Sequence, residues 1–214
     1  MKLLLLGATG LVGGRALRLA LSDDAFSEVI APTRTPLAAH ARLVNPVASK
    51  LEDLVPACIA HRPDAVVCAL GTTQAKAGSK QAFRYVDHEL PVTFGQAAHA
   101  AGIGTYAIVT AMGASASSLF FYPRTKGEVE RDIRAIGFRS LTICRPSLIG
   151  GERQEERRAE GMALTWARRL GPVLPARWRV NPAAAIAAAL LDAVAAAAPG
   201  CHWINSEDMQ YISK

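Results

Sequence analysis

The chain has 214 residues, of which half are hydrophobic and a fifth are charged, so it can bury a full core as one globular domain and disorder is not expected. Its net charge of +6 suits an anionic cofactor or substrate. The basic residues are scattered rather than gathered into one run, so we do not expect a nucleic-acid-binding protein.

The sequence shows no membrane segment or metal motif. The first apolar run ends at Gly7, which is too short for the apolar region of a secretory signal. The alanine-rich stretch from Ala183 to Ala198 is interrupted by Asp192 and is too weakly apolar to span a bilayer. The cysteines form no C-x-x-C pair and have no nearby histidine pattern, so no metal site is expected. We therefore expect a cytoplasmic protein that does not bind membranes.

Apolar runs of strand length alternate with amphipathic runs of helix length along the whole chain, which is the pattern of βαβ units around a parallel sheet. The expected strands are Lys2–Leu6, Glu28–Thr33, Arg42–Val47, Ala65–Leu70, Thr105–Thr110, Ser140–Arg145 and His202–Ile204. The expected helices are Leu11–Leu21, Lys50–Ala60, Lys80–Ala101, Leu119–Ile136 and Pro182–Ala198. For the last helix, Asn181 is the expected N-cap.

This pattern predicts an α/β protein with a doubly wound, mostly parallel sheet of about seven strands. Residues 1–214 are expected to form one domain, in which residues 150–181 are a small C-terminal substrate lobe. Ligands of such sheets bind outside the carboxyl ends of the strands. The residues that follow each strand are therefore the candidate site residues.

A glycine-spaced turn, Gly7 to Gly13, follows the first expected strand. Gly7 allows a sharp turn, Gly10 lacks the Cβ that would hold the backbone away from a pyrophosphate, and Gly13 lets the next helix pack closely. The positive end of that helix favours phosphates. Such spacing also arises by chance, but its place directly after an apolar strand favours a dinucleotide site. The residues predicted to bind the dinucleotide here are Gly7, Ala8, Thr9, Gly10, Leu11 and Val12.

Arg34 follows the second expected strand, where a cofactor without a 2′-phosphate would usually meet an acidic side chain. A guanidinium can bind a phosphate through two parallel hydrogen bonds and can stack on adenine. The sequence therefore favours NADP(H) over NAD(H). An exposed loop arginine is the alternative interpretation.

Leu70, Gly71 and Thr72 form a turn of small residues after the fourth expected strand. A ribose and a nicotinamide can lie across such a turn because no bulky side chain blocks it. The alternative is that Gly71 merely ends the strand.

Tyr122 and Lys126 are four residues apart at the start of an expected helix, so they share one helix face. A phenol ordinarily keeps its proton at neutral pH, and a neighbouring lysine can stabilise the phenolate and so allow proton exchange. Lysine can also bind ribose hydroxyls. An exposed helix face is the alternative, but the place after the fifth strand of a nucleotide-binding sheet favours catalysis.

Taken together, the turn Gly7–Gly13, the strand end at Leu70, Tyr122 with Lys126, and the run Arg145-Pro146-Ser147 resemble the short-chain dehydrogenase/reductases, which have the Rossmann fold. The chain is most similar to the atypical branch related to the Tat-interacting oxidoreductase-like proteins. The runs that carry this second resemblance are Lys76-Ala77-Gly78, Val86-Asp87, Lys126 to Glu130 and Arg153-Gln154-Glu155.

The resemblance implies roles for individual residues. Tyr122 would be the general acid and base with Lys126 as its partner, while Pro146, Ser147 and Leu148 would lie beside the nicotinamide. The nearest match to the family serine that binds the substrate carbonyl is Thr110, with Ser115 as the alternative. Asp87 stands where the family often has an asparagine.

We therefore expect an NADP(H)-dependent oxidoreductase that acts on a small carbonyl or alcohol substrate. The alternative is an NADPH-binding regulatory or interaction protein without turnover, and Thr110 and Asp87 favour it because both depart from the family pattern. A related isomerase or epimerase is a weaker alternative. The sequence leaves the substrate and the oligomeric state open.

Overall fold

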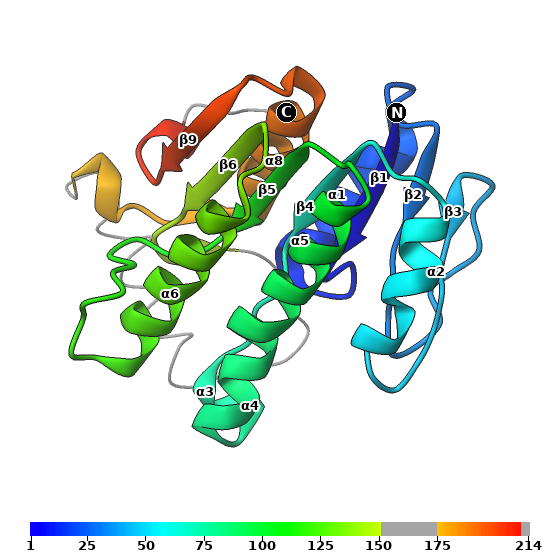
Figure 1. Ribbon diagram of the computed structural model, residues 1–214. Coiled ribbons are helices and arrows are strands. Elements are labelled where there is room, and N and C mark those ends of the chain that lie inside the picture. The colour runs from blue at the N-terminus through cyan, green and yellow to red at the C-terminus, as the bar shows by residue number, and fades with distance from the viewer. Residues whose placement is uncertain (151–174, 211–214) are drawn as a thin grey trace.

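The computed structural model describes residues 1–150 and 175–210, and its centre is a seven-stranded sheet (Figure 1). The strand order is β3-β2-β1-β4-β5-β6-β9, and every neighbouring pair is parallel. The first six strands follow the order typical of Rossmann folds, so the predicted α/β class and doubly wound sheet are confirmed. The strands are β1 (Lys2–Leu6), β2 (Glu28–Ile30), β3 (Leu43–Val44), β4 (Ala65–Cys68), β5 (Thr105–Val109), β6 (Ser140–Arg145) and β9 (Gly200–Asn205).

Helices connect these strands, and a second, two-stranded parallel ladder lies near the end of the chain. The ladder pairs β7 (Ile149–Gly150) with β8 (Asn181–Pro182). The α-helices are α1 (Leu11–Ser22), α2 (Val55–Ala60), α3 (Gln74–Ala77), α4 (Lys80–Arg84), α5 (Leu90–Ala100), α6 (Phe121–Ile136) and α8 (Ala183–Ala196). A π-helical segment, η2 (Tyr85–Glu89), joins α4 to α5, and short 3₁₀ turns are η1 (Glu52–Leu54), η3 (Ala176–Trp178) and η4 (Asp208–Gln210).

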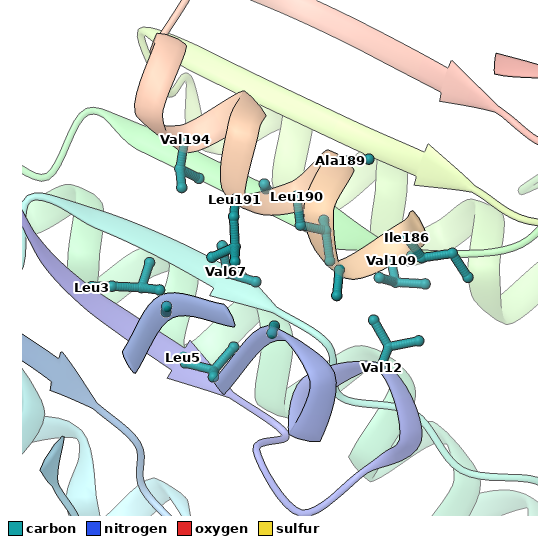
Figure 2. Packing of buried hydrophobic residues seen from close by; sticks show 14 of the residues in the cluster. Leu3, Leu5, Val12, Val67, Val109, Ile186, Ala189, Leu190, Leu191 and Val194 are labelled. Atoms are coloured by element: carbon teal, nitrogen blue, oxygen red, sulfur yellow. The ribbon is translucent and has the colours of Figure 1, made fainter. Parts of the chain in front are cut away.

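The central strands are buried on both faces. One face packs against α1 and α8, and Figure 2 shows Leu3 and Leu5 of β1 beside Val12 of α1 and the apolar residues of α8. The other face, which includes Leu4 and Leu6, packs against α2, α5 and α6. Since alternate residues of a strand point to opposite faces, strands buried on both sides read as unbroken apolar runs. This is why the strands were visible in the sequence.

The predicted helix from Lys80 to Ala101 is interrupted by the π-helical turn of η2. The N–H of Leu90 donates to the carbonyl of Tyr85, five residues back. Pro91 follows at once and has no N–H, so it cannot continue the regular hydrogen-bond ladder. The helix therefore widens by one residue just before the proline, and η2 carries Asp87 and His88.

The predicted role of Asn181 as a helix N-cap is wrong, because Pro182 occupies the cap position of α8. The fully buried amide of Asn181 instead joins two loops. Its oxygen accepts from the N–H of Ser147 at 2.9 Å and from the hydroxyl of Ser206 at 2.8 Å, and its Nδ2 donates to the Ser206 carbonyl at 2.8 Å. Asn181 thus ties the loop after β6 to the loop after β9.

Other differences concern strand length and the substrate lobe. The predicted strands Glu28–Thr33 and Arg42–Val47 are regular only in β2 and β3, and beyond them an isolated bridge joins Thr33 to Val47. Most of the predicted lobe, residues 151–174, lies outside the described residues, as does the run Arg153-Gln154-Glu155. Among the helices of the described ranges, none has the length and apolar character needed to cross a bilayer.

Replacing the Asn181 side chain tests its structural role. Asn181→Ala leaves a buried carbonyl, a buried N–H and two hydroxyls without their partner, so we expect the free energy of unfolding to fall by about 2–4 kcal/mol in urea denaturation. The matched control is Asn205→Ala, whose exposed side chain should change stability by less than about 0.5 kcal/mol. Equal effects of the two substitutions would contradict the assignment.

Candidate active site

The glycine turn draws β1, α1 and the end of β4 into close contact. Gly7 has φ +85°, and a Cβ there would lie 2.6 Å from the carbonyl oxygen of Ala69. A Cβ at Gly13 would overlap the carbonyl of Gly7. The N–H of Gly10 donates to that same carbonyl at 2.8 Å and closes the turn. A side chain at Gly7 or Gly13 would force the turn apart.

The N-terminus of α1 is left open for an anion. Gly10 is its N-cap, no side chain of the described residues caps the helix, and its first turn contains no acidic residue. The side chains of Ala8 and Val12 are buried in the core, so these two residues offer only their backbone to a ligand. Unpaired N–H groups at the carboxyl end of β1 fit the pyrophosphate of a dinucleotide.

Arg34 lies exposed in a turn that is held by buried polar contacts. The hydroxyl of Thr33 donates to the carbonyl of Thr35 at 2.7 Å, and Asn45 Nδ2 donates to the Thr33 hydroxyl at 2.8 Å. The loop after β3 therefore fixes the backbone that presents the guanidinium.

Glu52 and Tyr85 belong to this end of the site, and sequence reasoning did not find them. The hydroxyl of Tyr85 donates to the Glu52 carboxylate. Burial, and next the Glu52 carboxylate, raise the pKa of Tyr85 to about 12, while the nearby Arg34 lowers it. Tyr85 is therefore a neutral donor that anchors the carboxylate. The available signal was the acidic pair Glu52-Asp53 after the third strand.

Lys126 reaches the turn after β4 from inside the protein. Its residue is only 5% exposed, and its Nζ lies 2.8 Å from Asp87 Oδ1. The other oxygen of Asp87 accepts from the N–H of Thr72 at 2.9 Å. A Cβ at Gly71 would lie 3.9 Å from Lys126 Nζ, so the ammonium sits directly beneath this turn. Asp87 thus joins Lys126 to the Gly71–Thr72 backbone.

Tyr122 stands at the surface in the first turn of α6, one turn before Lys126. It is 41% exposed, and its ring packs against Phe83 with a centroid distance of 5.7 Å. Leu119 and Phe120, just before it, are also exposed. The phenol is therefore accessible to a substrate, and its charge interacts with that of Lys126.

Thr110 is turned away from this opening. It is 3% exposed, and its hydroxyl donates to Glu130 Oε1 at 2.6 Å, with the Cys144 carbonyl 3.3 Å away. Glu130 in turn binds Arg145 through Nε at 3.0 Å and through Nη2. Because its hydrogen is engaged inside the protein, the hydroxyl has no hydrogen left to donate to a substrate carbonyl in this conformation.

Ser115, the alternative to Thr110, is exposed and packs beside α6. Its N–H donates to the Pro123 carbonyl at 3.0 Å, and its hydroxyl lies 3.0 Å from that of Ser117. A Cβ at Gly127 would overlap the backbone of Ser115 and Ala116, so this glycine permits the close approach. Ser115 is the more accessible of the two hydroxyls.

The loop after β6 is held by its backbone and by Asn181. The Pro146 carbonyl accepts from the N–H of Met112 at 2.8 Å, and the Ser147 hydroxyl donates to the carbonyl of Arg179. Leu148 is half exposed. Since the Ser147 side chain serves the loop itself, this segment offers a ligand mainly its backbone and Leu148.

The chain was compared with known proteins. No protein-family model matches it. It is 38% identical over 181 residues to the protein named Fmp52, mitochondrial, of Emericella nidulans, which covers 79% of this chain and 76% of that protein. It is 35% identical over 184 residues to the protein of the same name in Candida albicans, with coverage of 83% and 79%.

Solved structures with the same fold bind a nicotinamide cofactor. The Bordetella bronchiseptica enzyme WbmH, solved with NAD+, has a TM-score of 0.73 at 17% identity, over 96% of this chain and 75% of that one. The UDP-N-acetylglucosamine 4-epimerase of Bacillus cereus has a TM-score of 0.69 at 18% identity, with coverage of 96% and 79%. At these identities the likeness shows a Rossmann fold of the dehydrogenase and epimerase type.

The prediction of a cytoplasmic protein is contradicted by the relatives. Proteins between 35% and 41% identical to this chain carry the word mitochondrial in their names. The prediction rested on the short apolar run at the N-terminus and on composition. Those features argue against a secretory signal but carry no information about other cellular addresses.

Two substitutions test whether the Thr110 hydroxyl serves Glu130. Thr110→Val keeps the shape but removes the donor, so we expect the free energy of unfolding to fall by about 1–2 kcal/mol. Thr110→Ser keeps the donor and loses only a methyl group, so it should retain more of the stability of the unmodified protein. Urea denaturation measures both. If Ser costs as much as Val, the hydrogen bond to Glu130 is not what Thr110 contributes.

Proposed function

This chain belongs to the Fmp52 family, and we propose that it is an NADP(H)-dependent oxidoreductase of the short-chain dehydrogenase/reductase type, acting on a small carbonyl or alcohol substrate. One observation carries the proposal: the exposed phenol of Tyr122 stands one turn before a buried Lys126 whose ammonium lies beneath the turn after β4. A proton donor and a cation thus meet at the carboxyl ends of the strands of a Rossmann fold.

A nicotinamide dinucleotide fits the residues of the cradle. The uncapped N-terminus of α1 would bind the pyrophosphate through backbone N–H groups of the run from Ala8 to Val12. The exposed Arg34 would bind the 2′-phosphate, because the turn from Ala31 to Thr35 contains no acidic side chain to repel it. Lys126 and the turn Leu70-Gly71-Thr72 would hold the nicotinamide ribose. A bound reduced nicotinamide supplies a hydride.

The chain's own residues would then manage the proton. Tyr122 Oη would donate its proton to the substrate oxygen during reduction and accept it during oxidation. The Lys126 ammonium would stabilise the phenolate in between. The loop of Pro146, Ser147 and Leu148 would pack beside the nicotinamide. Thr110 would act through Glu130 as a positioning residue rather than on the substrate, which leaves Ser115 as the accessible hydroxyl.

The second candidate is an NADPH-binding regulatory or interaction protein without turnover, as in the proposed kinship with the Tat-interacting oxidoreductase-like group. Two observations favour it. The Lys126 charge is balanced by Asp87, and the Thr110 hydroxyl is engaged inside the protein. We also propose that residues 150–181 contribute to the substrate site, and the names of the relatives favour a mitochondrial location.

Substituting Arg34 tests the choice of cofactor. Arg34→Ala removes a charge-assisted contact to the 2′-phosphate, so we expect NADPH affinity to fall about ten- to a hundredfold while NADH affinity changes little. Fluorescence titration of both nucleotides measures the ratio. The matched control is Arg18→Ala, an exposed arginine on α1, which should leave the ratio unchanged. An unchanged ratio in Arg34→Ala would contradict the proposed NADP preference.

Substituting Tyr122 tests turnover. Tyr122→Phe keeps the ring contact with Phe83 but removes the proton donor, so we expect NADPH oxidation with small carbonyl compounds to slow by about 10²–10⁴-fold while NADPH affinity stays the same. Loss of NADPH absorbance measures the rate. If the unmodified protein binds NADPH but oxidises it with no member of a broad carbonyl panel, the regulatory candidate replaces the enzyme.

A further inference from the structure

Asp87 is a buried carboxylate that joins two parts of the candidate site. It is 2% exposed and lies in the π-helical segment η2. One of its oxygens lies 2.8 Å from Lys126 Nζ on α6, and the other accepts the Thr72 N–H in the turn after β4 at 2.9 Å. The proposed partner of Tyr122 and the proposed ribose turn are therefore held by the same side chain.

Two more ion pairs fix the height of η2 against α6. Arg84 binds Glu128, and His88 Nε2 lies 2.7 Å from Asp132. The two pairs advance by four residues on each side, so they form a parallel ladder between the two helical segments. Asp87 lies next to His88 and inside this ladder, and both members of the ladder are more exposed than the Asp87–Lys126 pair. The ladder keeps the helices in the register that pairs Asp87 with Lys126.

Close packing beyond the ladder restricts any sliding of these helices. A Cβ at Gly95 of α5 would lie 3.0 Å from Ile133 Cδ1 of α6. The helices therefore touch backbone to side chain one turn after Pro91. Because this contact and the ladder act together, Asp87 cannot leave Lys126 without disturbing both helices.

The charges around Lys126 come from several elements. Burial disfavours the ammonium, but Asp87 and, next, Tyr122 outweigh it and raise the pKa of Lys126, so the lysine stays charged. Cys68 of β4 also faces the pair, and burial raises the pKa of its thiol to about 11, so it stays neutral. Among the described residues that act on Lys126, Asp87 thus supplies the charge that balances the ammonium.

We propose that Asp87 is a positioning residue that holds Lys126 beneath the Gly71–Thr72 turn and offsets its charge, so that Tyr122 keeps its proton at neutral pH and the site favours carbonyl reduction over alcohol oxidation. The proposal rests on the proposed function. In that reduction the hydride, with its electron pair, passes from the reduced cofactor to the carbonyl carbon, whose π bond to oxygen breaks. The Tyr122 proton passes to the carbonyl oxygen, and the exposed phenolate regains a proton from water.

The substitution Asp87→Asn tests the charge without changing the shape. Asparagine can still accept the Thr72 N–H, but it leaves the Lys126 ammonium unbalanced. We expect ionisation of Tyr122 to occur about one pH unit lower, since an opposite charge within about 4–6 Å shifts an acid by this amount or more. The readout is the ultraviolet absorbance of the phenolate, taken as the difference between each protein and its Tyr122→Phe counterpart. It requires neither cofactor nor substrate.

Two further variants keep the test decisive. Glu128→Gln removes a carboxylate from the neighbouring ion pair on the same helices and should leave the titration of Tyr122 unchanged. The double variant Asp87→Asn with Lys126→Met buries no unpaired charge and stays informative if Asp87→Asn alone does not fold. It should titrate near the unmodified protein, whereas Lys126→Met alone should titrate at higher pH.

The proposal is overturned if Asp87→Asn titrates like the unmodified protein, if Glu128→Gln shifts the titration as far, or if the double variant matches Lys126→Met. Failure of the proposed function is a separate result. It would appear as absent NADPH oxidation in the unmodified protein, with the tyrosine titrations unaffected.

Discussion

Two backbone contacts decide where a dinucleotide could lie on this sheet. Any side chain at Gly7 would press on the Ala69 carbonyl, and any at Gly13 would overlap the Gly7 carbonyl. Hydrogen atoms at these two positions let β1, α1 and the end of β4 meet where the strand order reverses direction. The open N-terminus of α1 faces that point. The remaining candidate site residues are placed around this opening, since each follows a strand that ends at the same edge.

Helix α6 links the candidate chemistry to the core through two buried charge networks. Lys126 pairs with Asp87 below the turn after β4, and Glu130 joins Thr110 to Arg145 at the ends of β5 and β6. Burying charges in this way gives little net stability, but removing one partner is costly because the other is left unpaired. These networks therefore fix geometry more than they add stability. They hold the Tyr122 face of α6 at one height relative to the sheet.

Much of the fold was visible in the sequence because each strand is buried on both faces and reads as an apolar run. The expected bounds of Lys2–Leu6 and Ser140–Arg145 agree with β1 and β6. Local patterns were less informative where a distant partner decides the conformation. Asn181 has the residue type of a helix cap, yet its amide serves loops that lie about 25 to 34 residues away in sequence. Pro91 stood inside the expected helix, and the π-helical turn before it was not foreseen.

The sequence by itself determined the parallel α/β architecture, the glycine cradle and the spacing of Tyr122 and Lys126, because these depend on periodicity and on neighbours within one or two helical turns. Only the tertiary structure decided what the polar side chains do. It directed the Thr110 hydroxyl to Glu130, paired Asp87 with Lys126 and set Tyr85 against Glu52. Each of these contacts joins segments far apart in the chain. A buried polar group takes whichever partner the packing brings near, and no local pattern records that choice.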